Sequence, residues 1–488
     1  MTLLHARAGH LPGLLDADVR WERLAFEAGG DRLEVDVPTL DAAQMQALAE
    51  RVRQASARHL KTMTVSDIIA VIDRAVARLL DRDDPFRIQA ERLLPIVSGF
   101  DADMIRKGLT GYLKTFRAPQ LKRFVAEDFA NPKVLDEFQP TPKGGAVRAF
   151  GPDLLVHSWA GNVPALPLWS LVCGLLAKAG SVGKVPSAEP LFAGWFAQLL
   201  AEVHPPWAEC LAVVWWRGAG DEAASTLFAK ADTVMAYGGN EALDALRRRL
   251  PASTRFLPHG HKLGVGLVAA SALDALHGPR QARLAAWDVA RYDQQGCYSP
   301  HVFYVERGGA VSPRQFADYL AAELANLHCR YPRRTLLLED SAAMARWRQA
   351  VEWQAMGEAG DSVSLIADGA ADWGVAHFER MQPLAPTALQ RHVQVIAVEH
   401  FDEVMPQLAP HARFLQTAGV AAAPAELFRL AEQLGAVGVT RISAIGSMTT
   451  PQAGWHHDGR FSLLDLMRMT EIEASAEHSA DDFAPYAD

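Results

Sequence analysis

The sequence predicts an α/β protein built around a parallel sheet that is covered by helices on both faces. Between residues 151 and 236, helical stretches alternate with four short apolar runs, at residues 154–157, 182–185, 211–216 and 233–236. Strands buried on both faces are continuously apolar, and the β-α-β order implies parallel pairing through crossover helices. Such sheets bind nucleotides at the carboxyl ends of their strands. The first block is therefore expected to be a Rossmann-type cofactor domain.

The length, charge and cysteine content of the chain limit its class. Its 488 residues are 49% hydrophobic, which suits two or three globular domains, and its net charge of −9 argues against nucleic acid as a partner. The four cysteines include no CxxC pair, so we expect neither a disulfide framework nor a thiolate zinc site. No signal peptide is recognisable, and the longest apolar stretch, residues 163–177, is short and interrupted. We expect a cytoplasmic protein without a membrane span.

Residues 1–140 are predicted to be mainly helical. Asp41 and Gln44 form an N-cap pair before an apolar repeat at helical spacing. Ser66 is the predicted cap of a second helix, whose apolar side includes Ile68 and Ile72. Prolines and glycines between residues 140 and 145 predict a loop that ends this region.

A second α/β block begins near residue 259. Helices are predicted at residues 313–327 and 340–356, and apolar runs predict strands at residues 264–270, 301–306, 362–366, 393–398 and 437–445. The polar, acidic tail after residue 473 is expected to be disordered.

Three segments of the first block carry residues that suit an anion or a nucleotide. Asn162 lies between a predicted strand and a helix, where its amide either donates to a developing oxyanion or caps the helix. Lys184 ends a strand within reach of a ribose, although taken alone a surface role is the simpler interpretation. Gly238 and Gly239 either permit close approach of a pyrophosphate or serve only as a turn.

Cys297 is the candidate nucleophile of the second block. It follows Gly296 in a polar loop and precedes a predicted strand. A thiolate is a strong nucleophile and a good leaving group, which suits thioester exchange. A buried and inert cysteine is the alternative, but the polar setting favours catalysis.

Several histidines could assist or compete with this role. His261, His301 and a helix N-terminus are candidates for activating Cys297. His456 and His457 precede Asp458, but adjacent histidines point in different directions, so no metal site is predicted there.

Taken in chain order, these segments resemble the aldehyde dehydrogenase superfamily. There an Asn-containing turn, a Lys-containing strand end, a Gly-rich turn and a QGxC-like loop follow one another at similar intervals. The resemblance implies that Cys297 is the nucleophile and that Asn162 is the oxyanion donor. It also places Lys184 at the cofactor ribose, and Gly238 and Gly239 at the second cofactor turn.

A closer resemblance is to the long-chain acyl-CoA reductases, the reductase components of bacterial bioluminescence fatty-acid reductase complexes. It rests on LLVHSWAGNVPALP, QQGCYSP, RISAIG, WHHDGRFSLLDL and MIRKGL, which begin at residues 154, 294, 441, 455 and 104. That family makes aldehydes from acyl-CoA with NADPH. The resemblance therefore implies reduction of a fatty acyl thioester, bound to coenzyme A or a carrier, through an acyl-Cys297 intermediate. It also implies a homo-oligomer whose partners are the acyl-transferring or acyl-activating enzymes of a reductase complex.

Two departures from the hydrolytic aldehyde dehydrogenases carry information. Those enzymes place a Glu before an LGG turn as the base that activates water, whereas here KLGV is preceded by His261, with Lys262 as its first residue. A thioester reductase must not hydrolyse its acyl-enzyme, so this loss is consistent with reduction, although His261 is itself a possible base. The KPSE motif reads KVPSAE, with Ser187 near the Glu position, which makes room for the 2′-phosphate of NADPH. The EIFGP segment, a second ribose contact, is missing.

The resemblance divides the chain into a helical region (1–140), an NADP-binding domain (141–258) to which residues 431–473 return, a catalytic domain (259–430) that carries Cys297, and an acidic tail (474–488). A hydrolytic NAD(P)-dependent aldehyde dehydrogenase and a Cys-dependent acyltransferase remain alternative functions. A non-catalytic scaffold is disfavoured, because both Cys297 and Asn162 are present.

Overall fold

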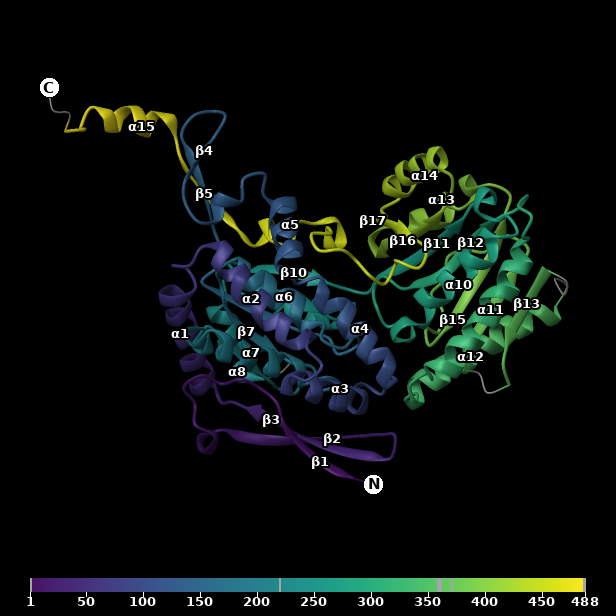
Figure 1. The fold of residues 1–488 in the computed structure, drawn as a ribbon, viewed down its shortest axis with the longest axis horizontal. Coiled ribbons are helices and arrows are strands. Elements are labelled where there is room, and N and C mark those ends of the chain that lie inside the picture. The colour runs from purple at the N-terminus through teal and green to yellow at the C-terminus, as the bar shows by residue number, and fades with distance from the viewer. Residues whose placement is uncertain (1, 219–220, 358–361, 370–371, 486–488) are drawn as a thin grey trace.

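The computed structural model describes residues 2–218, 221–357, 362–369 and 372–485. Figure 1 shows two α/β lobes side by side, with a small sheet at the N-terminus and a strand-and-helix arm that projects at the C-terminus. Within the described ranges, no helix combines the length and the apolar character needed to cross a membrane.

The first 140 residues contain a sheet that the sequence prediction missed. Three strands, β1 (Leu3–Arg7), β2 (Arg20–Ala28) and β3 (Asp31–Thr39), pair in the order β1-β3-β2. Alternate residues of β3 face the core, where Leu33, Val35 and Val37 are fully buried. The predicted helices follow as α1 (Ala42–His59), α2 (Val65–Leu80), α3 (Pro85–Ser98), α4 (Ala102–Lys114) and α5 (Ala118–Asp128).

The predicted parallel sheet forms the core of the first lobe. Its strands are β6 (Leu154–Ser158), β7 (Gly180–Lys184), β8 (Leu211–Val214), β9 (Thr233–Tyr237) and β10 (Arg255–His259), in the order β10-β9-β6-β7-β8. Every neighbouring pair is parallel. The intervening helices are α6 (Pro167–Leu176), α7 (Phe192–Val203), α8 (Glu222–Lys230) and α9 (Asn240–Arg247). The predicted fold class is confirmed.

The second lobe contains a seven-stranded sheet. Its order is β13-β14-β15-β12-β11-β16-β17, and only β13 runs antiparallel to its neighbour among the described strands. The strands are β11 (Leu263–Val268), β12 (Pro300–Glu306), β13 (Val363–Ala367), β14 (Gly374–Phe378), β15 (His392–Val398), β16 (Leu415–Ala421) and β17 (Arg441–Ala444). The long helices that accompany them are α10 (His277–Ala290), α11 (Pro313–Arg330), α12 (Leu338–Met356) and α14 (Pro424–Ala436).

The C-terminal part departs from expectation in two ways. The return to the first lobe begins later than residue 431, because β17 pairs with β16 of the second sheet. After β17, Asp458 bonds to His259 at the end of β10, and the carbonyls of Asp465 and Met467 accept hydrogen bonds from the guanidinium of Arg255. The tail expected to be disordered contains a helix, α15 (Ala474–Asp481), because alanines and Glu477 favour helix; residues 486–488 lie outside the described ranges.

The two lobes meet at the place where the candidate residues lie. Strands of the first sheet end at Lys184, Tyr237 and His259, and the second sheet begins with β11 and β12 directly after Lys262 and the Cys297 loop. The carboxyl ends of one parallel sheet thus face the amino ends of another. β18 (Arg468–Ile472) pairs with β5 (Ala146–Phe150), which also pairs with β4 (Gln139–Pro140), and this sheet and α15 form the projecting arm (Figure 1).

Candidate active site

The loop that carries Cys297 has an unusual backbone. Tyr292, Asp293 and Gln294 have φ angles of 49°, 50° and 63°, a left-handed conformation that non-glycine residues rarely adopt. Two buried contacts hold it: Arg391 Nε donates to Asp293 Oδ1 at 2.7 Å, and the backbone N–H of His392 donates to Gln294 Oε1 at 2.9 Å. Such strain persists only where the surroundings fix it, and it is concentrated at functional sites. Cys297 itself is partly exposed.

Asn162 lies against this loop. Its side-chain Nδ2 donates to the carbonyl oxygen of Gln295 at 2.6 Å. The alternative role as a helix cap does not apply, because α6 begins at Pro167 and its N-cap position is Leu166, without a side-chain cap. The amide keeps a second N–H. Asn162 itself does not line the cavity that contains Cys297, although the next residues, Val163 and Pro164, do.

The predicted cofactor residues lie at the carboxyl edge of the first sheet. Lys184 ends β7 with its ammonium 6.0 Å from the ring of Trp216, and no carboxylate of the described residues pairs with it. Burial lowers the pKa of Lys184. Ser187 is exposed, and its hydroxyl accepts a hydrogen bond from Trp215 Nε1 at 3.1 Å.

Gly238 and Gly239 join β9 to α9, two strands away from Lys184. Gly239 is the N-cap of α9 and has no side chain to satisfy the first N–H groups of the helix. A negatively charged group such as a pyrophosphate can therefore be bound there.

The two histidines suggested as activators of Cys297 are placed elsewhere. His301 lies buried in β12, where its Nδ1 accepts the backbone N–H of Thr387 at 3.2 Å and burial lowers its pKa to about 4. His261 lines a different cleft, together with Asn240 and Arg413. Neither lines the cavity that contains Cys297.

Sequence analysis missed a hydrogen-bonded cluster centred on Asp458. His259 Nδ1 bonds to Asp458 Oδ2 at 2.8 Å, and Gln416 Nε2 donates to Asp458 Oδ1 at 2.8 Å. The Gln416 side chain also acts on Cys297, whose pKa it lowers. Lys262 Nζ lies 3.8 Å from Asp458 Oδ1. These residues come from four separate segments of the chain. In the sequence alone, only the adjacent residues His457 and Asp458 formed a recognisable pattern.

The electrostatics of this cluster keep Cys297 protonated. Burial raises the pKa of the Cys297 thiol to about 12, and the charge of Asp458 acts in the same direction, opposed by Gln416 and Lys262. Burial alone would raise the pKa of Asp458, but the hydrogen bond from His259 and the neighbouring charges hold it below its usual range. At neutral pH the nucleophile therefore requires a base.

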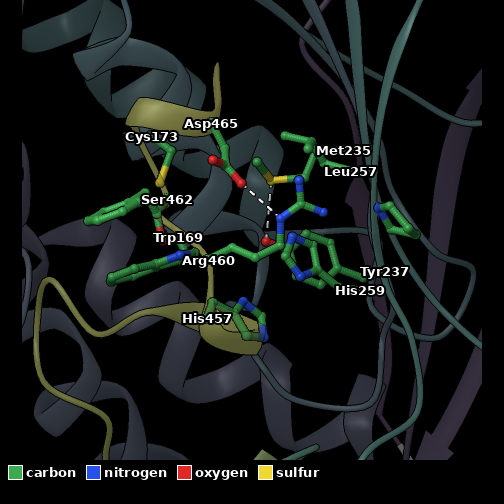
Figure 2. Close-up of a pocket in the computed structure, with 12 residues that line it drawn as sticks. Trp169, Cys173, Met235, Tyr237, Leu257, His259, His457, Arg460, Ser462 and Asp465 are labelled. Carbon is green, nitrogen blue, oxygen red and sulfur yellow. Dashed lines mark hydrogen bonds and ion pairs between the residues drawn. The ribbon is translucent and has the colours of Figure 1, made fainter. Parts of the chain in front are cut away.

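The side chains of His259, His457 and Asp458 have donor atoms within 4.8 Å of one another. The two imidazole rings are stacked, with centroids 4.4 Å apart and planes inclined by 12°. Both histidines are labelled in Figure 2. Because the lone pairs of stacked rings lie in parallel planes, they do not converge on one ion. The arrangement is that of a hydrogen-bonded stack rather than of a metal centre.

A cavity of about 430 Å³ leads to Cys297. Its lining is mainly apolar and includes Val163, Leu166, Trp169, Tyr237, Tyr298 and Trp455. The exposed residues Gly111, Lys114 and Arg123 also line it, which places its opening at the C-terminal end of α4 and at α5.

Comparisons with known proteins agree with this geometry. A family model described as acyl-CoA reductase (LuxC) matches residues 60–469. A long-chain acyl-protein thioester reductase of Photorhabdus luminescens is 26% identical over 371 residues, which cover 74% of this chain and 72% of that protein. The long-chain acyl-protein thioester reductase 2 of Photobacterium leiognathi is 27% identical over 371 residues, covering 73% and 72%.

Solved structures with the same fold are aldehyde dehydrogenases. Aldehyde dehydrogenase 21 of Physcomitrella patens superposes with a TM-score of 0.73 at 13% identity, covering 97% of this chain and 99% of that one. The aldehyde dehydrogenase KauB of Pseudomonas aeruginosa gives 0.73 at 16% identity, covering 95% and 96%. The chain has the aldehyde dehydrogenase fold and belongs to the acyl-CoA reductase (LuxC) family.

Proposed function

We propose that this protein reduces a long-chain acyl thioester to an aldehyde, with NADPH as hydride donor and Cys297 as the acylated residue. The observation that carries the proposal is the mainly apolar cavity of about 430 Å³ that is lined in part by Cys297. An apolar lining suits the alkyl chain of a long-chain acyl group.

Different residues attack the reacting carbonyl and stabilise the negative charge that develops on its oxygen. The thiolate of Cys297 attacks the thioester carbon, the donor thiol leaves, and the acyl group stays on Cys297. Asn162, whose Nδ2 bonds to the carbonyl of Gln295 in the same loop, and the backbone N–H of Cys297 stabilise the oxyanion.

Residues at the edge of the first sheet suit a nicotinamide dinucleotide. Gly239 leaves the N–H groups of α9 free for a pyrophosphate, and Lys184 has no carboxylate partner among the described residues. When bound, NADPH supplies the hydride that releases the acyl group as aldehyde. Ser187 lies near the position that the hydrolytic enzymes fill with an acidic side chain. The absence of a negative charge at Ser187 favours binding of a 2′-phosphate.

The surroundings of Cys297 disfavour hydrolysis of the acyl-enzyme. Asp458 is the carboxylate that influences Cys297 most strongly, and both of its oxygens accept hydrogen bonds, from His259 and Gln416. It is therefore not free to activate a water molecule as the base of a hydrolytic aldehyde dehydrogenase does.

The donor is proposed to be a thioester of coenzyme A or of a protein. The two relatives described above are named acyl-protein thioester reductases. We propose that this chain likewise receives acyl groups from acyl-transferring or acyl-activating enzymes. We also propose that it acts as a homo-oligomer.

The direct test incubates the purified protein with tetradecanoyl-CoA and NADPH and follows nicotinamide absorbance together with aldehyde formation, with Cys297→Ala as control. We expect NADPH oxidation and aldehyde formation in equal amounts, both abolished in Cys297→Ala. Thioester loss that does not depend on NADPH would instead support an acyltransferase, and oxidation of aldehyde without coenzyme A would support a hydrolytic dehydrogenase.

A further inference from the structure

Three aromatic rings, those of Tyr237, His259 and His457, form a stack near the nucleophile, and a fourth ring, that of Trp455, lies tilted against His457. Tyr237 and His259 lie 4.7 Å apart, His259 and His457 lie 4.4 Å apart, and His457 and Trp455 lie 4.6 Å apart, measured between ring centroids. Figure 2 labels the three stacked residues Tyr237, His259 and His457. Tyr237, Trp455 and His457 also line the cavity that contains Cys297.

His457 is the member of the stack with an unused imidazole. Its side chain makes no hydrogen bond to the described residues, its exposed fraction is 11%, and its Nε2 lies 4.0 Å from Asp458 Oδ2. His259, in contrast, is bonded to Asp458 through Nδ1. A largely buried imidazole that is left without a hydrogen bond in a substrate cavity is available to exchange a proton with whatever enters.

We propose that His457 is the acid–base catalyst of acyl transfer, which removes the proton from Cys297 Sγ and returns it to the departing thiol. Asp458 and His259 are positioning residues: they hold the imidazole of His457, and the Asp458 carboxylate stabilises its protonated form. Gln416, which bonds Asp458 and acts on Cys297, donates to the sulfur as the thiolate develops. The inference rests on the proposed function, because it concerns the acylation of the same cysteine.

The proton and the electron pairs balance without a further reactant. The ring nitrogen of His457 takes the thiol proton, the sulfur forms a bond to the thioester carbon, and the bond from that carbon to the donor sulfur breaks. The donor leaves as a thiolate and takes the proton from the imidazolium. His457 is then neutral again, Cys297 is acylated, and a free thiol has been released.

The surroundings explain how a buried imidazole can carry a charge during this exchange. Burial lowers the pKa of His457 to about 3 and raises that of Cys297 to about 12, so neither group ionises alone near neutral pH. Transfer between them forms an imidazolium next to the Asp458 carboxylate and beside the ring of Trp455, both of which stabilise a cation.

Among the described residues, the titratable groups close to His457 include three from other elements. They are Tyr237 at the end of β9, His259 at the end of β10, and Lys262 directly before β11. His259 and Lys262 disfavour the imidazolium, whereas Asp458 favours it. Removing the Asp458 charge should therefore impair the same step as removing His457.

The test measures acylation alone, in the full chain and without NADPH, as the release of coenzyme A from tetradecanoyl-CoA in a single turnover. For the unsubstituted protein we expect a rate that is nearly constant between about pH 5 and pH 9, because a neutral imidazole is present throughout. For His457→Gln we expect a rate at pH 7 that is lower by a factor on the order of 10² to 10⁴, and that rises about tenfold per pH unit as the thiolate of Cys297 forms. Added imidazole should partly restore His457→Gly.

Two further variants make the result specific. His456→Gln is the matched control, because His456 is the neighbouring histidine, is exposed and packs edge-on against Phe461. It should acylate normally. Asp458→Asn should give a smaller loss with a rate that still changes little with pH, because His457 remains, and it serves as the second probe if His457→Gln melts at a much lower temperature.

Normal acylation by His457→Gln, with an unchanged pH profile, would overturn the inference while leaving the proposed function intact. Absence of acylation in the unsubstituted protein would overturn both.

Discussion

At the scale of single residues, Asn162 and Ser187 have separate proposed roles: Asn162 stabilises the oxyanion, and Ser187 sets the preference for NADPH. Asn162 lies against the nucleophile loop, with its Nδ2 2.6 Å from the carbonyl oxygen of Gln295. If it stabilises the oxyanion, Asn162→Ala should lower kcat by a factor of about 10² to 10³ and leave the melting temperature nearly unchanged. Steady-state reduction of tetradecanoyl-CoA measures this, and Asn131→Ala, remote from the site, is the control. An unchanged kcat would exclude Asn162 from catalysis.

Ser187 is predicted to set the preference for NADPH. Ser187→Glu places a negative charge where the 2′-phosphate is proposed to bind, so we expect the KM for NADPH to rise at least about tenfold, which is about 1.4 kcal/mol, with little change for NADH. Ser187→Ala controls for loss of the hydrogen bond from Trp215. Equal effects on both cofactors would place the 2′-phosphate elsewhere.

Some site residues could be found in the sequence, and others could not. Cys297, Asn162, Lys184 and the glycine pair lie in short segments whose order is informative. Gln416, Asp458 and His259 meet only because β16, the turn after residue 456 and the end of β10 converge on Cys297. No pattern within a single segment of the sequence predicts that these residues come together.

At the scale of elements, helix α4 borders the proposed acyl cavity. A side chain at Gly111 would meet no atom within 4 Å at its Cβ, and Gly111 lines the cavity near solvent. Gly111→Phe should therefore fold normally but obstruct the end of long chains. We expect the optimal chain length of acyl-CoA to shift to shorter chains, measured as kcat/KM from 6 to 16 carbons. Gly435→Phe, at a similarly open position in α14, is the matched control and should leave the profile unchanged.

Helix α7 begins at a buried carboxylate whose ionisation should affect stability. Glu189 is 2% exposed and accepts the backbone N–H groups of Leu191 and Phe192, each at 2.9 Å. Burial raises its pKa from 4.5 to about 7, despite these hydrogen bonds. Between these pH values the folded state keeps a proton that the unfolded state has lost, so stability falls as the pH rises, by about 3 kcal/mol in total.

Glu189→Gln should remove that pH dependence, as measured by denaturant unfolding at pH 4.5 and pH 8. Glu202→Gln, at an exposed position of the same helix, should retain it. A slope that survives in Glu189→Gln would assign the effect to another group.

The helices and strands that the sequence predicted correctly are those whose local pattern is determined by one effect, either apolar burial or helix capping. The apolar runs that became β6 to β9 are buried on both faces, and the Asp41–Gln44 capping box is present in α1. The predicted cap Ser66 lies inside α2, because Thr64 is the N-cap. The N-terminal sheet was missed because β2 and β3 alternate charged with apolar residues, which lowers the apolar content of each run.

At the scale of the whole molecule, two sheets from distant parts of the chain create the site. The fold class and the division into two α/β lobes followed from the order of apolar runs and from the family resemblance. The point at which the chain returns to the first lobe could not be predicted in this way. It depends on β17, which joins the edge of the second sheet through its tertiary pairing with β16. The match to residues 60–469 leaves the N-terminal sheet outside the family region.

The central claim is that a covalent acyl group on Cys297 is the species that NADPH reduces. It is tested most directly by mass spectrometry of the intact protein after incubation with tetradecanoyl-CoA, before and after addition of NADPH. The account predicts one tetradecanoyl adduct that maps to Cys297, persists without NADPH, and disappears with formation of an equal amount of aldehyde when NADPH is added. An adduct that is absent, maps to another residue or is released as the free acid would contradict it.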